Sequence, residues 1–410
     1  MWSLLHRPGV PGLAAAGLLS EVGDWMLFVA LPLFVLQLTG SPLVTATVFA
    51  LELVPTVVAA PLAGVLIDRM DRWRLMIGVA AVQALGLLPL LAVDSAADLW
   101  LVYVVVVVES ALGTVIEPCR TATAATLVPA GDLMAVNQLM GVLSSAARLV
   151  GGPLGGLLLG TAGIDAVLVA DAATFAVAAA LLMAGSRGRT ATRAAPSPRV
   201  RLLHDWGDGL RVVARAPVLR RIMGVVALMA VAQGAFVVLF VLFVVRDLGG
   251  SETDVGVLRG VQAIGALAGG ALLGLAVRRL SAGRLVVVSL AAFGALSLVI
   301  WNGPAVTTAF GVYVGLFIAA GAPGLATMTG LLTLLQEHAP DAGRGRVIST
   351  FFAVFGGVQA IGMLLAGLVG TGAGLTAALQ VQGVLYLVAA GLAVRVEQAA
   401  HPHRSSHCGR

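Results

Sequence analysis

Eight charged side chains of this 410-residue chain lie inside long apolar stretches, where a charge is costly. They are Glu21, Asp24, Glu52, Glu109, Glu117, Arg148, Asp171 and Arg259. A charge at the centre of a membrane helix adds about 2.5–3.5 kcal/mol to the cost of insertion, so such residues persist where they are paired or face a cavity. All but Arg259 belong to the first half of the chain. This asymmetry predicts that the first half binds a coupling ion and that the second half mainly shapes a substrate site.

The acids and one arginine of this set are suited to carrying a proton. Glu21 and Asp24 are three residues apart on one helix face, and two partly desolvated carboxylates resist double ionisation, so one of them can hold a proton near neutral pH. We predict proton coupling at Asp24, Glu21, Glu52 and Glu109. Arg148 is expected to form a salt bridge to an acid of the first or fourth span, which breaks when that acid is protonated. The alternative for each acid is a structural role as a cap or hydrogen-bond partner.

The remaining charges favour structural roles. Glu117 and Arg120 are three residues apart and predict a local ion pair at the inner gate. Asp171 is expected to be paired structurally, and Arg259 is expected to extend toward the outer surface.

Composition excludes most other classes of protein. The chain is 59% hydrophobic and 11% charged, with a mean hydropathy of +1.00, whereas soluble domains are about 25% charged. A soluble enzyme and a disordered chain are therefore excluded. All 25 basic residues other than histidine are arginine, so the lysine of a P-loop ATPase is missing. We expect no enzyme activity, cofactor, metal site or nucleic-acid partner, because the arginines flank membrane segments and the His- and Cys-containing tail, 401–410, is interpreted as solvated.

Counting charge-free stretches of about 20 residues predicts an all-α membrane protein with twelve transmembrane helices. The predicted spans are 12–38, 42–66, 74–93, 98–118, 133–158, 164–185, 221–245, 254–277, 284–301, 305–332, 347–369 and 375–395. A β-barrel is disfavoured, because runs such as Val102–Val108 do not alternate apolar and polar residues.

The arginines set the expected orientation and domain organisation. If both termini are cytoplasmic, all but three of the 25 arginines fall in inner loops, as the positive-inside rule requires. The predicted domains are a six-helix bundle over 1–186, a cytoplasmic linker over 187–220, a second six-helix bundle over 221–397 and a tail over 398–410. Within the linker, 202–215 is predicted to be an amphipathic helix on the membrane surface, with Trp206 as an anchor.

The two halves resemble each other at corresponding places. The stretch from Gly64 to Arg74 follows the second predicted span, and a similar stretch from Gly274 to Arg284 follows the eighth. Internal six-helix repeats are typical of transporters.

These residues resemble the major facilitator superfamily. The loop between the second and third spans matches its signature through Gly64, Asp68, Arg69, Arg72 and Arg74. The resemblance covers nearly the whole chain. Within the superfamily the chain is most similar to bacterial drug and siderophore exporters of the drug:proton antiporter type, through stretches at 23–25, 117–120 and 343–347. It departs from them in having Glu109, Ser110 and Ala111 where the middle of span four often carries an arginine.

The resemblance implies a pseudo-twofold major facilitator fold, a midplane cavity between the halves and alternating access. It implies that the loop signature gates the carrier, and we expect Asp68 to accept hydrogen bonds at the start of span three and to meet Arg120. Closely spaced glycines predict helix packing: Gly152, Gly155, Gly156 and Gly160. An apolar wall suits a lipophilic ligand, and its candidate residues are Phe28, Phe34, Gln233, Phe236, Phe240, Phe351, Phe355 and Gln359; each could instead contact another helix or lipid.

Together these observations predict a monomeric secondary transporter in the bacterial plasma membrane that exports a lipophilic small molecule by proton antiport. One charge moved across 100 mV is worth about 2.3 kcal/mol, a concentration gradient of roughly fifty-fold. The alternatives are uptake or exchange of a small metabolite and a non-transporting membrane scaffold. An inert scaffold has no use for carboxylates inside the membrane, and this argues against the last alternative.

Overall fold

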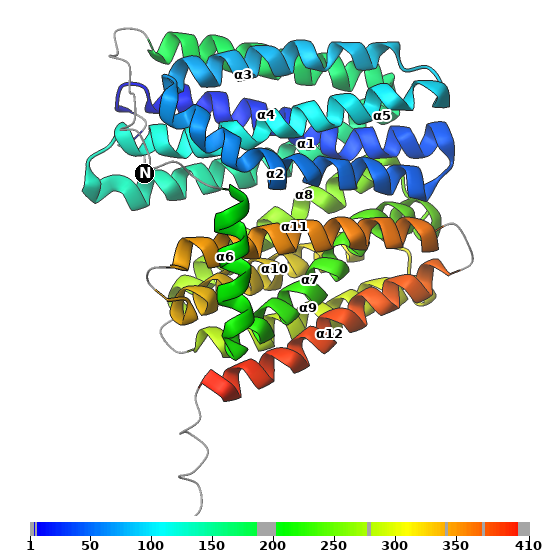
Figure 1. Ribbon diagram of the computed structural model, residues 1–410. Helices are drawn as coiled ribbons and strands as arrows, with labels where there is room; N and C mark the ends of the chain where they lie inside the picture. The colour runs from blue at the N-terminus through cyan, green and yellow to red at the C-terminus, as the bar shows by residue number, and fades with distance from the viewer. Residues whose placement is uncertain are drawn as a thin grey trace, which may run out of the picture. The chain divides into compact units, whose positions relative to one another are not determined.

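The computed structural model describes residue 4 and residues 6–186, 202–276, 280–340, 343–370 and 374–400, and throughout these residues the chain is helical without a strand (Figure 1). The α-helices are α1 (Val10–Thr39), α2 (Pro42–Arg69), α3 (Arg72–Gly86), α4 (Leu99–Thr126), α5 (Leu133–Ser186), α6 (Leu202–Arg215), α7 (Pro217–Leu242), α8 (Glu252–Ala276), α9 (Ala282–Asn302), α10 (Phe310–His338), α11 (Arg344–Val369) and α12 (Leu375–Ala400).

The helices are long and apolar enough to confirm the predicted membrane fold. Nine helices of the described chain meet the length and hydropathy needed to cross a bilayer. One of them, α5, has 54 residues and is broken at Gly163, whose φ of 80° is non-helical, so it supplies two spans. With α2 and α8, which have 28 and 25 residues, the predicted total of twelve spans is reached.

Local signals explain where several helices begin and end. Ser41 caps α2 by accepting a hydrogen bond from the backbone N–H of Val44, and Ser281 caps α9 in the same way. Gly40 ends α1 with a φ of 65°, a conformation that favours glycine because a Cβ would be strained there. The connection between α9 and α10 is a short 3₁₀ segment, Gly303–Ala305.

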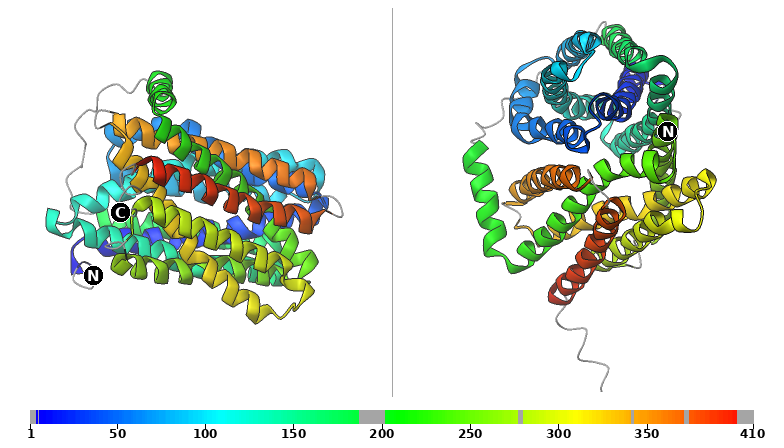
Figure 2. Two further views of the ribbon diagram at one scale, coloured as in Figure 1. Left: turned by 90° about the horizontal axis from the view of Figure 1, so that it is seen from below. Right: turned by 90° about the vertical axis from the view of Figure 1, so that its right-hand side faces the viewer.

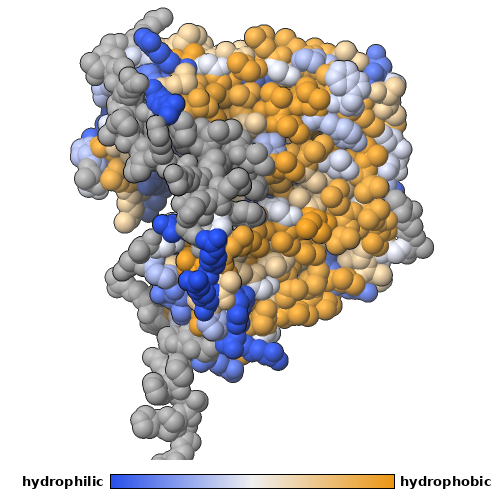
Figure 3. Space-filling view, in the orientation of Figure 1, coloured by the Kyte–Doolittle hydropathy of each residue, from blue (hydrophilic) through white to orange (hydrophobic). Residues whose placement is uncertain are grey.

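Apolar side chains cover most of the visible helix surface, as a membrane-embedded protein requires (Figure 3). Exposed large residues include Leu85, Trp100, Val306 and Leu368. In water this much exposed apolar surface would promote aggregation, whereas in lipid it is the stable arrangement.

The chain forms two compact units whose boundaries do not follow chain order. The N-terminal unit contains Met1–Val200 and Val244–Ala263, and the C-terminal unit contains Arg201–Phe243 and Ile264–Arg410. Helix α8 is therefore divided: its first half packs with the N-terminal unit.

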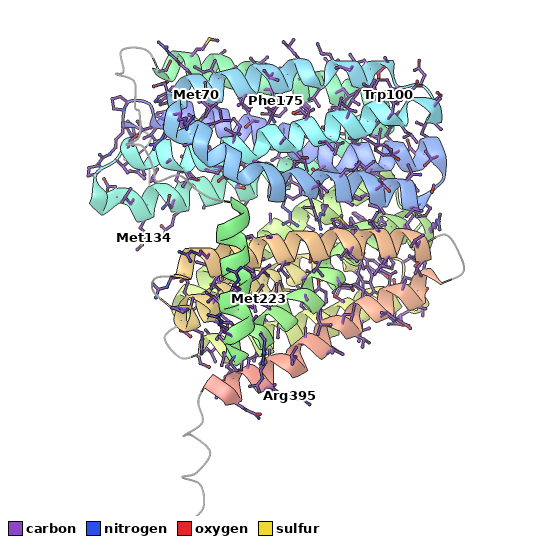
Figure 4. All side chains as sticks on the ribbon, viewed as in Figure 1. Met70, Trp100, Met134, Phe175, Met223 and Arg395 are labelled. Carbon is purple, nitrogen blue, oxygen red and sulfur yellow. The ribbon has the colours of Figure 1, made fainter. Side chains whose placement is uncertain are left out.

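In the N-terminal unit, α1 packs along α5, α2 packs along α4, and α3 lies against α4 and α5. Viewed along their axes, the helices of this unit are arranged in a ring (Figure 2, right). The helices alternate in direction, so Met70 and Met134 lie at one end of the unit and Trp100 at the other (Figure 4). This alternation fits the short connections between successive spans.

Glycines allow the closest helix contacts of this unit. A Cβ on Gly151 or Gly155 of α5 would overlap the backbone of α1 at Val22 or Met26. A Cβ on Gly156 would overlap the backbone of α8 at Glu252, and a Cβ on Gly256 of α8 would overlap that of α5 at Gly152. The structure therefore locates Gly152, Gly155 and Gly156 at helix crossings. A Cβ on Gly160 would lie 3.3 Å from the Glu252 carboxylate, a side chain that can move.

These contacts predict a stability difference between two glycines of α5. Gly155→Ala is expected to lower the free energy of unfolding by about 1–3 kcal/mol, because the methyl group forces α1 and α5 apart. Gly141→Ala is the control: its Cβ would meet no atom within 4 Å, and alanine favours the helix by up to about 1 kcal/mol. Thermal unfolding of the purified variants in detergent measures both; equal unfolding temperatures would contradict the crossing.

In the C-terminal unit, α7 packs against α11 and α12, and α9 packs against α10 and α12. Helix α7 is mostly buried, and an aromatic cluster surrounds its end, with Phe243 and Trp301 ring centroids 4.9 Å apart. The Trp301 indole N–H donates to Gln382 at 2.9 Å. The amphipathic helix predicted over 202–215 is confirmed as α6, which contacts α11 and α7; the Trp206 side chain lies outside the described side chains.

Candidate functional site

A buried ion pair joins α1 to α4 in the N-terminal unit. Arg120 of α4 is only 5% exposed, and its guanidinium is ion-paired with the carboxylate of Glu21 on α1 and, at 2.6 Å, with that of Glu117 one turn earlier on α4. The predicted Glu117–Arg120 pair is thus present, and Glu21 is an additional partner that sequence reasoning missed. The signal available was the helical spacing of Glu109, Glu117 and Arg120, which puts all three toward one face of α4.

Gly17 provides the room for this arginine. It lies one turn before Glu21 on α1, and a Cβ at this position would overlap the Arg120 guanidinium. The absence of a side chain lets Arg120 cross to α1 and reach Glu21.

The ion pair borders a pocket enclosed by α1, α3, α4 and the second half of α5. Its polar lining residues are Ser20, Glu21, Asp24, Gln83, Glu117 and Arg120, and the remainder is apolar, including Met76, Ile116 and Phe175. Asp24 lies one turn after Glu21, and its charge interacts with those of Glu21 and Arg120. The pocket therefore brings both acids of α1 together with the acid–arginine pair of α4.

Two deeper acids lie near this group. Asp171, in the second half of α5, is 0% exposed; one of its oxygens accepts a hydrogen bond from Thr174 and lies where a Cβ of Gly23 would be. Glu109 of α4 lies beside Gly86 of α3, and the Gln83 side chain of α3 interacts with its carboxylate. Both carboxylates interact electrostatically with Asp24.

Among the described residues, Arg148 forms no salt bridge to an acid of the first or fourth span, in contrast to the expectation from the sequence. Its guanidinium donates to the Gln262 side-chain oxygen at 2.5 Å and to the Arg259 carbonyl at 3.3 Å, and it stacks over the Trp25 ring at 4.9 Å. Its partners are thus an amide, a carbonyl and an aromatic face, all neutral. The prediction was wrong because the first half of α8 supplies acceptors that no local pattern links to α5.

Arg259 and Glu52 extend this second group. The Arg259 guanidinium lies 5.4 Å from the centroid of the Phe28 ring, and the charge of Glu52 interacts with those of Asp24 and Arg259. The expectation that Arg259 extends to the outer surface is wrong, since it is buried.

In the loop between α2 and α3, Asp71 caps α3 by accepting a hydrogen bond from the Arg74 N–H at 2.9 Å. Arg72 donates to the Ala122 carbonyl of α4 at 3.3 Å. Gly64, Asp68 and Arg69 lie in the last turns of α2, and the Asp68 side chain lies outside the described side chains. Arg69 and Arg74 are exposed.

The predicted substrate wall divides into packed and accessible residues. Phe236, Phe240 and Phe351 are at most 5% exposed and contact other aromatic rings of the C-terminal unit, so in this structure they pack against other helices. Phe28, Phe34, Phe355 and Gln359 are half-buried and stay candidates. Gln233 accepts a hydrogen bond from Tyr386 at 2.9 Å. Over the described part of the chain, no group of three or more His, Cys, Asp or Glu side chains could hold a metal ion.

Comparison with known proteins places these features in a family. The pattern described as transmembrane secretion effector, of the major facilitator type, matches residues 2–406. The chain is 28% identical over 407 residues to the MFS-type transporter y4rN of Sinorhizobium fredii, covering 98% of each chain. It is 26% identical to YfiS of Bacillus subtilis, another MFS-type transporter, over 52% of this chain and 51% of the relative, so that match spans about half of each chain. Macrolide efflux protein A of Streptococcus pyogenes is 26% identical over 62% of this chain and 64% of the relative.

Solved structures with the same fold are transporters too. The peptide transporter POT in complex with sulfate superposes with a TM-score of 0.78 at 12% identity, over 96% of this chain and 95% of that one. An inward-facing bacterial homologue of the iron transporter ferroportin gives a TM-score of 0.72 at 16% identity, over 95% and 98%. At these identities only the fold is shared. With twelve spans and a family match over nearly its full length, the chain belongs to the transmembrane secretion effector family of major facilitator transporters, and it is a multi-pass membrane transporter rather than an enzyme.

Proposed function

We propose that this chain exports a lipophilic small molecule across the bacterial plasma membrane in exchange for protons, working as a monomer by alternating access with both termini in the cytoplasm. The observation that carries the proposal is the Glu21–Arg120–Glu117 group bordering a pocket that also contains Asp24. A carboxylate that alternates between pairing with a buried arginine and holding a proton couples protonation to the position of two helices.

The charge balance of the N-terminal unit supports proton coupling. Six carboxylates gather in its described membrane-spanning part, at Glu21, Asp24, Glu52, Glu109, Glu117 and Asp171. Three arginines accompany them there, at Arg120, Arg148 and Arg259, of which Arg148 contacts neutral groups. Asp24 and Glu117 are exposed, and the other four carboxylates still outnumber the three arginines by one. An unpaired charge is unfavourable in a medium of low dielectric constant, so we infer that a proton neutralises part of this excess.

The proposed direction of transport and the proposed class of substrate are supported by a relative and by the aromatic candidates. Macrolide efflux protein A is an efflux protein by name, and the half-buried aromatic candidates suit a lipophilic ligand. Uptake or exchange of a small metabolite remains the alternative function. A non-transporting scaffold would gain nothing from acids inside the membrane.

Asp24→Asn tests the proposal. In everted vesicles with an imposed pH gradient, the wild-type protein is expected to accumulate a lipophilic dye and to release protons into the external medium as a result, whereas Asp24→Asn loses at least tenfold of the concentrative flux because the amide cannot carry a proton. Asp98→Asn is the control, since the Asp98 carboxylate accepts hydrogen bonds from Ser95 in the turn before α4 and does not line the pocket. Dye pumping that persists in the presence of a proton ionophore would defeat the proposal.

A further inference from the structure

The pocket of the N-terminal unit has an exposed end and a buried end, with an arginine between them. The Glu117 side chain is 63% exposed, the Glu21 side chain 17% and the Arg120 side chain 6%. All three line the pocket. Arg120 is therefore held between an acid that is open to the surroundings and an acid that is largely closed off.

Two buried polar atoms at the pocket lack a partner. Nε of Arg120 and Oε2 of Glu21 make no hydrogen bond to any described residue. Buried polar atoms are nearly always satisfied, by ordered water where the protein offers nothing. The cavity volume of the pocket is about 100 Å³, and about 10–15 Å³ on this measure holds one water molecule, so several waters fit.

We propose that this pocket is a water-filled vestibule through which the coupling proton reaches Glu21 and Asp24 inside the N-terminal unit, separately from the substrate. The inference rests on the proposed function, because a proton path serves a proton-coupled carrier. The ligand of the vestibule is water that carries an excess proton. The carboxylates of the lining bind the proton, and the apolar residues of the lining keep the water out of the rest of the bundle.

Arg120 is the gate of this vestibule. A proton delivered by water adds to the Glu21 carboxylate, which becomes neutral and loses its ion pair with Arg120. The guanidinium keeps its bond to Glu117, at the exposed end, and moves toward it, so that the contact between Glu21 of α1 and Arg120 of α4 is lost. Loss of the proton to water reverses the movement.

Other charged groups act on this exchange from neighbouring helices. They are Glu52 of α2, Glu109 of α4 and Asp171 of α5, and each interacts electrostatically with Asp24. Gln83 of α3 lines the pocket and can hydrogen-bond to the water.

Thiol accessibility tests for the water. A methanethiosulfonate reagent with a trimethylammonium head reacts only with thiols that water reaches, and Cys408→Ser removes the thiol of the tail. Gly113 lines the pocket and Gly78 of α3 does not; a Cβ at either would meet no atom within 4 Å. Gly113→Cys is expected to react at least tenfold faster than Gly78→Cys, at a rate that a saturating transported dye leaves unchanged. Equal rates, or protection of Gly113→Cys by the dye, would overturn the proposal.

A second variant tests the gate. Gly17→Ala places a methyl group against the Arg120 guanidinium, whereas in Gly12→Ala, on the same helix, the nearest atom is 3.4 Å away. Gly17→Ala is expected to lower substrate-driven proton flux at least tenfold while dye exchange without a gradient stays within twofold of wild type; Gly12→Ala retains both. Equal proton fluxes in the two variants would refute the gate.

The two hypotheses fail in different ways. If the wild-type protein pumps dye without moving protons, the proposed function is wrong. If it moves protons but Gly113→Cys is unreactive, the function stands and the vestibule alone is refuted.

Discussion

Replacing Arg120 by glutamine is expected to abolish concentrative transport and to lower the free energy of unfolding by about 3–5 kcal/mol, the usual effect of leaving one member of a buried ion pair alone. Glu21 is the member left alone, because its side chain is only 17% exposed. Glu117 is 63% exposed and stays solvated. The measurements are dye efflux from vesicles and thermal unfolding in detergent.

A double variant separates stability from transport. Glu21→Gln/Arg120→Gln removes both charges, so most of the lost stability should return while pumping stays absent, since neither a proton carrier nor its partner remains. Glu117→Gln is the matched control on the exposed acid, and its effect on stability should stay below about 1 kcal/mol. Wild-type stability in Arg120→Gln alone would show that the pair is not needed for the fold.

The second large effect is expected for Gln262→Glu, which should raise the stability of the protein and lower its rate of transport. Gln262 accepts a hydrogen bond from Arg148 at 2.5 Å, and Gln262→Glu would turn this into an ion pair. A charged partner raises the contribution of a hydrogen bond from about 0.5–1.5 to about 1.5–3 kcal/mol. If α5 and α8 separate once per transport cycle, an added barrier of about 1.4 kcal/mol slows turnover tenfold.

The readouts for this variant are the unfolding temperature and the initial rate of efflux. We expect the first to rise and the second to fall in Gln262→Glu. Gln262→Leu is the control. It removes the acceptor, so the unfolding temperature should not rise and the initial rate of efflux should not fall. Faster efflux together with a higher unfolding temperature in Gln262→Glu would contradict the idea that this contact breaks during the cycle.

The fold was largely predictable because membrane helices obey local rules. The amphipathic helix predicted over 202–215 has the same bounds as α6, and the break expected between spans five and six is found at Gly163. Length, hydropathy and turn residues are all that these features require.

The site was less predictable, because its partners come from helices distant in the sequence. Arginines near helix ends are read as loop anchors by the positive-inside rule, and so Arg120 was expected at the inner surface although it is buried against Glu21. Nothing near Arg148 indicates that its acceptor is Gln262, more than a hundred residues later. Asp71 was predictable as a cap, since an acid directly before a helix commonly caps it, and the role expected for Asp68 stays a prediction because its side chain lies outside the described side chains.

Helix α8 has a mechanical consequence of its own. Residues up to Ala263 pack with one unit and residues from Ile264 with the other, although the helix runs unbroken from Glu252 to Ala276. The boundary between the two units within α8 lies just before Gly265, where a Cβ would overlap the backbone of α10 at Ile318. Because α8 is one continuous helix that belongs to both units, a substitution that stiffens or bends it near Gly265 would affect the packing of both units at once.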